Sequence, residues 1–489
     1  MKRKLPHFLT LSCLLFVISM SRGNADNFGR YVFSPPGSAE KAGWLVDAAD
    51  PSYPGKKGSR DTAQLKGNDD LPDLQQADDR LSISLQYRPR SEYRNGYKKP
   101  MSDSLKPAFV TNQRSRIGLS YQHPRFRSRI SFQDIRTWGE TRIKQDVSSF
   151  LLHQAWFEVF LDPSWSLKLG RQVLKYADQR FLAACNWNNV GATHDMALLK
   201  YDRPKRHVHL GLAYNNHASY LHERYQYYPE SFYKTMQFIW FSQDFGPRLE
   251  ASFLEITDGR KKEGSDRHLY FRTTMGINLD YQSGEQGLAL SGKAYWQGGK
   301  IREQERISAY FLAFKASYSW NRMALTLGGD YFSGDNGLDT NDRVNRAFNN
   351  LYGSGHGYYG SMDYFRTIDK HTGGGGLRDL YGKVAFHISG NTSADITYHH
   401  FSLAGNVAVL TGEGNKLKAL DRELGSELDF SLNHSFSKNF QVKAGYSLMF
   451  GTQSLAAIKG GDAKHTGNWG FVMLTFQPEI FVNNLIINQ

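Results

Sequence analysis

Arginines recur at every second position in three stretches near the start of the chain. The pairs are Arg88 and Arg90, Arg114 and Arg116, and Arg127 and Arg129. In an extended strand, residues two apart point to the same face. A guanidinium stays charged at physiological pH and binds a carboxylate through two parallel hydrogen bonds. The spacing therefore predicts three strands that present a wall of positive charge to anionic groups.

The sequence around these pairs alternates between apolar and polar residues. In NFQVKAGYSLMF (439–450), every second residue from Phe440 to Phe450 is apolar, and RMALTLGGDYF (322–332) has the same pattern. Such alternation is typical of a strand with one apolar and one wet face. Strands in soluble proteins usually span about 5–6 residues, whereas these are long enough for a transmembrane β-barrel. The segments expected to form strands are 81–93, 111–122, 125–138, 149–160, 164–176, 194–202, 206–217, 233–244, 247–258, 268–281, 286–297, 306–319, 322–334, 377–389, 391–403, 425–437, 439–451 and 467–477.

The connections between these segments alternate strictly between short and long. His123-Pro124 is a short connection, and the segments 94–110 and 335–376 are long ones. Outer-membrane barrels have an even number of strands, short periplasmic turns and longer outside loops. We therefore predict an all-β fold, a transmembrane antiparallel up-and-down β-barrel of about 18 strands with a water-filled lumen. Both termini are then expected in the periplasm.

The chain is predicted to have three parts. Residues 1–25 combine a basic head, an apolar centre and small residues at Gly23 and Ala25, as a secretory signal peptide does. Residues 26–80 are rich in Pro, Gly, Ser, Asp and Lys without any period, which indicates a flexible periplasmic N-terminal extension that could bind a periplasmic partner. Residues 81–489 are expected to form the barrel, with no further domain boundary.

The composition agrees with these assignments. The mean hydropathy of −0.54 and the lack of a second apolar run of about 18 residues exclude a helical membrane protein. Aromatic residues make up 14% of the chain, which fits the aromatic girdles of a barrel. After removal of the signal peptide, Cys185 has no cysteine partner within the chain. We expect a buried, unreactive thiol there, with a reactive thiol as the alternative.

Alternation also predicts which way the arginines point. A charged residue on the lipid face costs about 2–4 kcal/mol near the middle of the membrane, so the arginines should face the lumen. Residues 81–136 contain twelve Lys and Arg but only three Asp and Glu. The pattern indicates a pore for acidic solutes. In the alternative interpretation, lumen carboxylates neutralise the arginines, which then only brace the wall; the candidate partners are Glu250, Asp330, Glu427 and Asp429.

The longest predicted loop, 335–376, combines many glycines with aromatic residues. We expect it to fold over or into the lumen as a constriction, because loops this long are usually functional or disordered and its aromatic content argues against disorder. The aromatic residues expected to form the constriction are Phe348, Tyr352, Tyr358, Tyr359 and Tyr364. The acidic start of the loop is a weak candidate for calcium through Asp335, Asp339 and Asp342, but the closing Glu of an EF-hand is missing. We therefore expect an Asx-rich turn there and no metal.

Several motifs resemble the alginate export family of outer-membrane proteins. They are QDIRTWG (133–139), LGRQVLKYADQR (169–180), Trp187, His194-Asp195, FNNLYGSGHGYYGSMDYF (348–365) and FVMLTFQPEIF (471–481). The resemblance implies an eighteen-stranded barrel that passes an anionic uronic-acid polysaccharide through an arginine-rich lumen. The chain departs from that pattern in its long N-terminal extension and in the residues 482–489 that follow the last aromatic residue.

Charged residues within these motifs extend the predicted site. Arg136, Arg171, Asp178 and Arg180 join the candidate pore-lining or substrate-binding residues. The last three could instead form a structural ion-pair cluster at the outer rim. Trp138 and Trp187 could be interface anchors or platforms on which a sugar ring stacks.

The function predicted from the sequence is an outer-membrane channel of a Gram-negative cell for anionic solutes, in particular acidic (uronic-acid) poly- or oligosaccharides. The expected partners are membrane lipid and this solute; we expect no cofactor and no nucleic acid, and the oligomeric state and direction of transport are left open. The alternatives are an outer-membrane hydrolase and a non-conducting structural or adhesive barrel. The chain contains neither a G-x-S-x-G elbow nor an H-E-x-x-H motif, so we do not expect an enzyme.

Overall fold

The computed structural model describes most of the predicted barrel. The described residues are 79–482, except 143–144, 146–148, 217–218, 220, 222–232, 262–267, 285, 303–304, 340 and 411–416. The predicted signal peptide and the predicted extension up to residue 78 lie outside this range.

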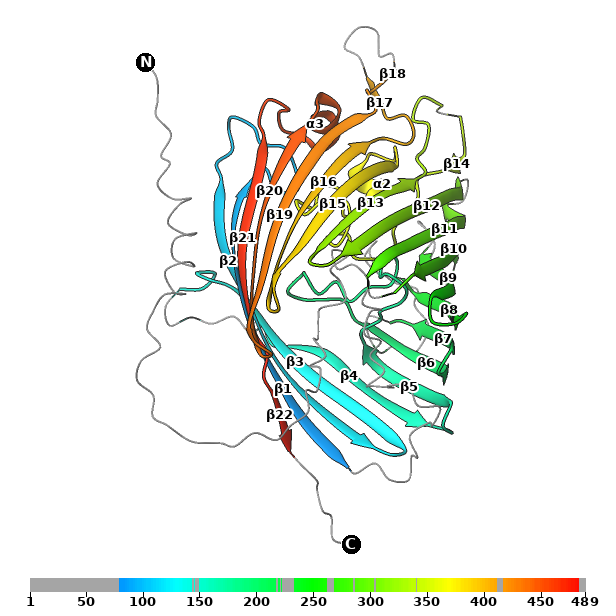
Figure 1. The fold of residues 1–489 in the computed structure, drawn as a ribbon. Helices are drawn as coiled ribbons and strands as arrows, with labels where there is room; N and C mark the ends of the chain where they lie inside the picture. The colour runs from blue at the N-terminus through cyan, green and yellow to red at the C-terminus, as the bar shows by residue number, and fades with distance from the viewer. Residues whose placement is uncertain are drawn as a thin grey trace, which may run out of the picture. The chain divides into compact units, whose positions relative to one another are not determined.

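Eighteen strands of the described chain pair side by side into a closed antiparallel barrel (Figure 1). They are β1 (Arg80–Asn95), β2 (Ala108–His123), β3 (Phe126–Thr137), β4 (Leu151–Phe160), β5 (Trp165–Gln172), β6 (His194–Arg203), β7 (Arg206–Tyr214), β8 (Thr235–Asp244), β9 (Leu249–Lys261), β10 (Leu269–Gln282), β11 (Gly287–Arg302), β12 (Glu305–Trp320), β13 (Met323–Phe332), β15 (Leu377–Ser389), β16 (Thr392–Ser402), β19 (Glu423–Ser437), β20 (Phe440–Gly451) and β21 (Gly467–Phe476). Each strand pairs with the next, and β21 closes the ring on β1, where Glu92 lies opposite Phe471. The fold class predicted from the sequence is confirmed.

The remaining elements are short. β22 (Glu479–Val482) continues along β1 beyond β21, and β14 (Val344–Asn345) adds two residues parallel to β12. The other short elements are a hairpin of β17 (Ala408–Leu410) and β18 (Leu417–Ala419), and the helices α2 (Ile368–His371) and α3 (Gln453–Lys459). Neither helix of the described chain is long and apolar enough to cross a membrane.

All eighteen predicted segments coincide with barrel strands, and they differ mainly at their ends. β11 extends to Arg302, beyond the predicted end at 297. β5 ends at Gln172 instead of 176. This strand is shorter than predicted because the apolar side chains that follow it, Leu174 and Tyr176, are buried in the interior instead of continuing along the sheet.

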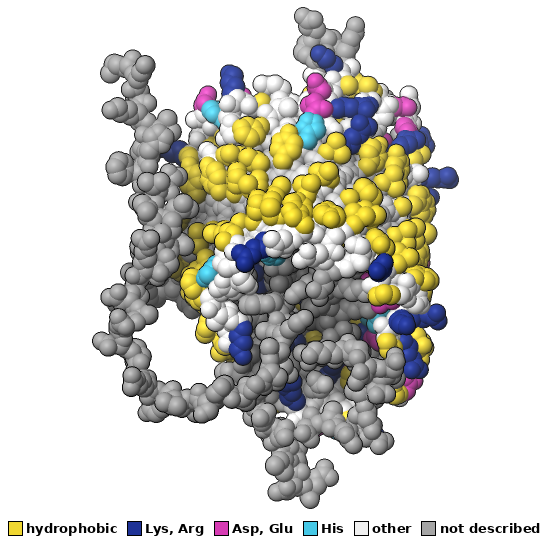
Figure 2. Space-filling view, viewed as in Figure 1, with side chains coloured by type: hydrophobic (Ala, Val, Ile, Leu, Met, Phe, Trp, Pro, Cys, Tyr) yellow, Lys and Arg dark blue, Asp and Glu magenta, His cyan; other side chains and the backbone are white. Residues whose placement is uncertain are grey.

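The outer face of the barrel is apolar. Figure 2 shows a broad band of hydrophobic side chains around the wall, with charged side chains gathered mainly at its two edges. The alternating exposed positions Leu325 and Leu327 of β13 belong to this face. Side chains such as these are exposed to the surroundings of the barrel rather than packed in a core, as expected for a wall that is in contact with lipid.

The buried core lies inside the barrel. Two loops fold inward, the β5–β6 loop (residues 173–193) and the β13–β15 loop (residues 333–376), and together with the inner face of the wall they form one apolar cluster. Phe181 and Phe348 of these loops meet at a ring-centroid distance of 5.7 Å. The lumen is therefore narrowed by packed protein.

Candidate functional site in the barrel lumen

The inner face of β1 and β2 presents its arginines to the β5–β6 loop. Arg88, Arg90 and Arg114 are only 3%, 7% and 0% exposed. Arg88 donates a hydrogen bond to the carbonyl oxygen of Asn186 (2.8 Å), and Arg90 donates one to the carbonyl oxygen of Trp187 (2.8 Å). The Arg90 guanidinium also lies 4.1 Å from the centre of the Trp187 ring. These guanidinium groups hold the loop against the wall through its backbone.

Arg116, Arg127 and Arg129 lie further toward the short-turn end of the barrel and are half-buried. Arg116 donates to the side-chain oxygen of Gln133 (2.6 Å), and Arg129 donates to the hydroxyl of Ser120 (2.7 Å). Arg127 forms an ion pair of 2.6 Å with Glu158 of β4. Both kinds of interaction occur here, since these contacts include a carboxylate as well as amide and hydroxyl oxygens.

The two inward loops are joined to each other by backbone hydrogen bonds. Tyr352 N–H donates to the carbonyl oxygen of Phe181 (3.1 Å), and Ala183 N–H donates to the carbonyl oxygen of Tyr352 (3.2 Å). Gly353 approaches so closely that a Cβ added to it would lie 1.7 Å from the carbonyl oxygen of Arg180. Only glycine fits at this position.

Arg180 connects the loops to the wall. Its guanidinium is paired with Asp330 of β13 and with Asp178 (2.8 Å), and it donates to the hydroxyl of Tyr359 (2.9 Å). Burial alone would raise the pKa of Asp178, but the cations of Lys293 and Arg180 outweigh it and lower that pKa to about 2. Asp178 therefore stays ionised, as expected for a carboxylate paired with cations.

The β13–β15 loop is also anchored on β19, three strands further round the barrel from β13. Met362 N–H donates to Glu427 of β19 (2.7 Å), and Ser361 N–H donates to Asp429 (3.3 Å). Beyond them, the hydroxyl of Tyr364 donates to the carbonyl oxygen of Gly96 (2.6 Å). The loop thus spans from β13 to β19 and to the loop after β1, so it crosses the interior.

The sequence was compared with models of protein families. A model described as alginate export matches residues 79–463.

The chain belongs to the alginate export family.

Solved structures share the barrel fold of this member of the alginate export family at low sequence identity. OccAB1 of Acinetobacter baumannii has a TM-score of 0.56 and 11% identity, covering 82% of this chain and 97% of that one. OccK3 (OpdO) of Pseudomonas aeruginosa has a TM-score of 0.55 and 12% identity, covering 82% and 96%. OpdK of Pseudomonas aeruginosa, solved with vanillate, has a TM-score of 0.52 and 10% identity, covering 82% and 99%. The comparison with curated proteins gave no match.

Family and fold together make this protein an outer-membrane channel with a porin-like barrel, in the outer membrane of a Gram-negative cell. The family match indicates a channel rather than an enzyme, and the solved structures show the fold.

Two of the predicted pore-lining residues face the membrane side instead. Arg136 lies on the same face of β3 as Ile130, whose side chain points outward, and pairs with Asp134 (2.8 Å). Arg171 lies opposite Asp195 on the outer face of β5 and β6, at 2.7 Å. The predicted lumen position is wrong for both arginines. The cost of an outward charge is small here, because each lies at the long-loop end of its strand and is paired with a carboxylate.

Asp178 and Arg180 lie together inside the barrel. The cluster considered from the sequence placed them with Arg171 at the outer rim, but Arg171 is on the other side of the wall. The two residues share a buried ion pair within the β5–β6 loop. Four carboxylates were considered as partners for the arginines, and Asp330 does contact Arg180. Glu427 and Asp429 accept backbone N–H groups of the β13–β15 loop. Glu250 accepts a hydrogen bond from the hydroxyl of Ser242 (2.7 Å).

The aromatic residues of the predicted constriction form the interior of the β13–β15 loop. Phe348, Tyr359 and Tyr364 are fully buried, and Tyr352 and Tyr358 are half-buried. They pack against the wall and the other loop, so most of their surface is directed to protein. Trp187 stacks on His356 at 4.0 Å inside the barrel, whereas Trp138 is exposed on the outside.

The acidic start of the same loop is folded as turns. Asp339 accepts the N–H of Asn341 (3.1 Å), and Asp342 accepts the N–H of Val344 (2.9 Å) and pairs with Arg346. Among the residues that the structure describes, Asp335, Asp339 and Asp342 do not converge on one point. Their arrangement corresponds to the expected Asx turns rather than to the weak calcium candidate.

The inward course of the β5–β6 loop was not predicted from the sequence. Two signals could have found it. The loop carries Leu174, Phe181 and Leu182, and neighbouring strands place apolar residues at lumen positions, such as Phe238 and Phe311. Apolar side chains that face the lumen need another segment of the chain packed over them, because their exposure to water is unfavourable.

Cys185 lies in this loop. Its thiol is directed at the carbonyl oxygen of Gly353, 3.6 Å away. Burial raises the pKa of the Cys185 thiol to about 11. The environment is that of the unreactive thiol expected from the sequence.

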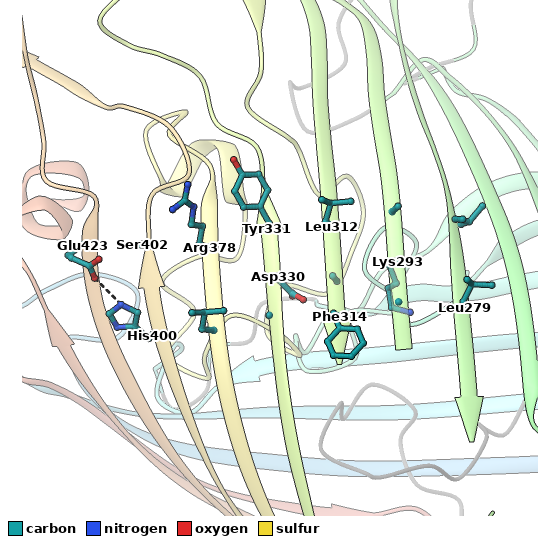
Figure 3. A pocket seen from close by; sticks show the side chains of 16 residues that line it. Leu279, Lys293, Leu312, Phe314, Asp330, Tyr331, Arg378, His400, Ser402 and Glu423 are labelled. Atoms are coloured by element: carbon teal, nitrogen blue, oxygen red, sulfur yellow. Dashed lines mark ion pairs between the residues drawn. The ribbon is translucent and has the colours of Figure 1, made fainter. Parts of the chain in front are cut away.

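A hollow of about 780 Å³ lies elsewhere, on β10 to β19 (Figure 3). It is lined mostly by outward side chains, among them Leu279, Leu312 and Phe314, and at one end by the ion pair of His400 with Glu423 (3.0 Å). These side chains belong to the apolar outer face, whereas Lys293 and Asp330, which also line the hollow, pair with Asp178 and Arg180 of the lumen.

Proposed function

We propose that the channel conducts anionic solutes, in particular acidic saccharides built from uronic acids, along the arginine-bearing wall of β1, β2 and β3. The proposal is supported by the excess of cationic over anionic side chains on the inner face of this wall. At the inward positions of the three strands, the cations are Arg80, Arg88, Arg90, Arg94, Arg114, Arg116, Arg127 and Arg129, and the carboxylate is Glu92.

An excess of one sign along a water-filled passage with low-dielectric walls concentrates ions of the opposite sign. Hydrogen bonds from these arginines to backbone, amide and hydroxyl oxygens fix the guanidinium groups without changing their charge. Of the half-buried members, Arg127 and Arg129 lie nearest the short turn, and Arg116 lies beside the end of the β5–β6 loop, where a Cβ added to Gly191 would be 3.8 Å from its guanidinium. They are the residues that we expect a passing carboxylate to meet.

Family membership supports a carboxylated saccharide as the solute. A guanidinium and a carboxylate match in geometry as well as in charge, and a row of guanidinium groups lets a chain of uronic acids exchange one contact for the next. The short-turn end of the wall, where Arg127 lies, would then be the periplasmic mouth.

Liposome swelling tests this function with the purified full-length protein. The rates are compared for a neutral and an acidic oligosaccharide of equal length, such as maltotriose and trigalacturonate. The acidic sugar should enter faster, and the difference should shrink as salt is added, because salt screens the wall. Equal rates at low salt would contradict the proposal.

A further inference from the structure

A hairpin at the short-turn end of the barrel brings three metal-ligating side chains to one point. In the pairing of β6 with β7, Asp202 lies opposite His207, and Lys200 lies opposite His209. Because the two histidines are two residues apart on one strand, both side chains point to the same face. Both histidines are buried on the inner side of the wall, and Asp202 is half-buried.

The ligand atoms are close together. His207 Nδ1 is 2.6 Å and His209 Nε2 is 3.0 Å from the same oxygen of Asp202, Oδ1. One nitrogen of each imidazole and the carboxylate oxygen all lie within 4.8 Å of one another. Within the described part of the chain, this is the one group of three such residues with that geometry.

The surrounding residues orient this group. The hydroxyl of Tyr176 lies 3.0 Å from His209 Nδ1, so it fixes the ring with Nε2 directed at Asp202. The Lys200 ammonium lies 3.3 Å from the other carboxylate oxygen, Oδ2, and 3.3 Å from Glu158. The ring of Trp240 lies 5.0 Å from that of His209 and covers the group on one side.

We propose that Asp202, His207 and His209 bind a divalent transition-metal ion, with Zn²⁺ as the representative case. Two imidazoles and one carboxylate are typical ligands of this ion, and sites with three protein ligands keep a further position for water or another ligand. The ion would take the place of the hydrogens that the imidazoles now share with Oδ1. His209 would then carry its proton on Nδ1 and donate it to Tyr176, the outer contact that metal-binding histidines usually make.

The positive charge of Lys200 works against a cation at this point. Its ammonium, however, lies against Oδ2 and Glu158 rather than against the histidines. Glu158 lies between Lys200 and Arg127, so its carboxylate is shared between these two cations. The oxygen Oδ1 therefore remains directed at the two imidazoles.

Zinc titration of the tag-free full-length protein in detergent, after treatment with a chelator, tests the site. Bound zinc is counted by elemental analysis after desalting, and the affinity is measured by calorimetry. Wild type should retain one zinc more than the variant H207Q/H209Q. The matched control H123Q/H465Q removes two histidines from a turn and a loop and should bind like wild type. Equal stoichiometry and affinity in wild type and H207Q/H209Q would overturn the proposal.

Two conservative variants test the site even if H207Q/H209Q does not fold. Asp202→Asn keeps the size of the side chain but removes its charge, so zinc binding should weaken more than tenfold. Tyr176→Phe removes only the outer contact, and the Kd should rise by about 10–100-fold with unchanged stoichiometry. Wild-type affinity in both variants would also contradict the assignment. Cobalt substitution gives an independent readout, because a site with these ligands should produce visible absorption that H207Q/H209Q lacks.

Discussion

The Arg180 guanidinium donates a hydrogen bond to the hydroxyl of Tyr359, 2.9 Å away, and joins two loops that are 179 residues apart in the chain. Asp330 holds the same guanidinium from the wall. This contact is central to how the lumen is narrowed, because the two loops are positioned by contacts with each other and with the wall, in addition to the two-residue pairing of β14 with β12.

Replacing Arg180 should loosen both loops. The variant R180Q leaves Asp330 as a buried carboxylate without its guanidinium partner, which typically costs about 3–5 kcal/mol. We expect a lower unfolding free energy in urea titrations of the protein in lipid vesicles, together with larger and noisier single-channel conductance. R346Q is the control, since it breaks the exposed pair with Asp342 and should have a much smaller effect. Similar losses in both variants would show that Arg180 has no special role.

The close approach at Gly353 gives a second prediction. The variant G353A places a methyl group against the carbonyl oxygen of Arg180, and such overpacking usually costs about 1–3 kcal/mol. The loops should separate, and the channel should conduct more. At Gly390, by contrast, an added Cβ has no neighbour within 4 Å, so G390A should behave like wild type. If G353A retains wild-type stability and conductance, the loops are not packed as described.

Removing the middle of the β13–β15 loop should widen the passage. A variant in which residues 351–363 are replaced by a short Gly-Ser linker loses the segment that meets the β5–β6 loop and β19. Its single-channel conductance in planar bilayers should rise severalfold. An unchanged conductance would mean that the ion path does not pass this loop.

The strand pattern could be predicted from the sequence because lipid contact imposes a rule of period two on every strand. The same rule placed the arginine pairs of β1, β2 and β3 on the inner face. It is less reliable near the strand ends, where Arg136 and Arg171 lie on the outer face beside carboxylates. Close to the membrane surface an outward charge costs little, so alternation no longer determines the direction of a side chain there.

The course of the loops could be predicted only in part. The aromatic residues between 348 and 365 indicated that the β13–β15 loop folds inward. The contact of Tyr352 with Leu182 could not be deduced, because it depends on a pairing between loops about 170 residues apart. The apolar inner positions, such as Leu198 and Ile256, were a sign of this core. A prediction that assumes a polar side chain at every inward position does not detect these residues.

The thiol of Cys185 reports on the closure of the two loops. At pH 8 an ordinary thiol with a pKa of about 8.5 is roughly one quarter ionised, whereas a thiol with a pKa of about 11 is ionised to roughly one part in a thousand. Labelling by iodoacetamide should therefore be slow at pH 8 and rise toward pH 11. In G353A the rate at pH 8 should increase at least tenfold, because the thiol gains access to water. Fast labelling of the folded wild type, located by peptide mass spectrometry, would contradict the buried position.

Reversal potentials across a salt gradient test the positively charged lumen wall most directly. The variant R116Q/R129Q removes two guanidinium groups from the inner face, and R136Q/R171Q removes two from the outer face, so both change the net charge equally. We predict that wild type and R136Q/R171Q prefer anions, and that R116Q/R129Q loses much of this preference, most clearly at low salt. Equal reversal potentials in wild type and R116Q/R129Q, or a cation preference in wild type, would contradict the account.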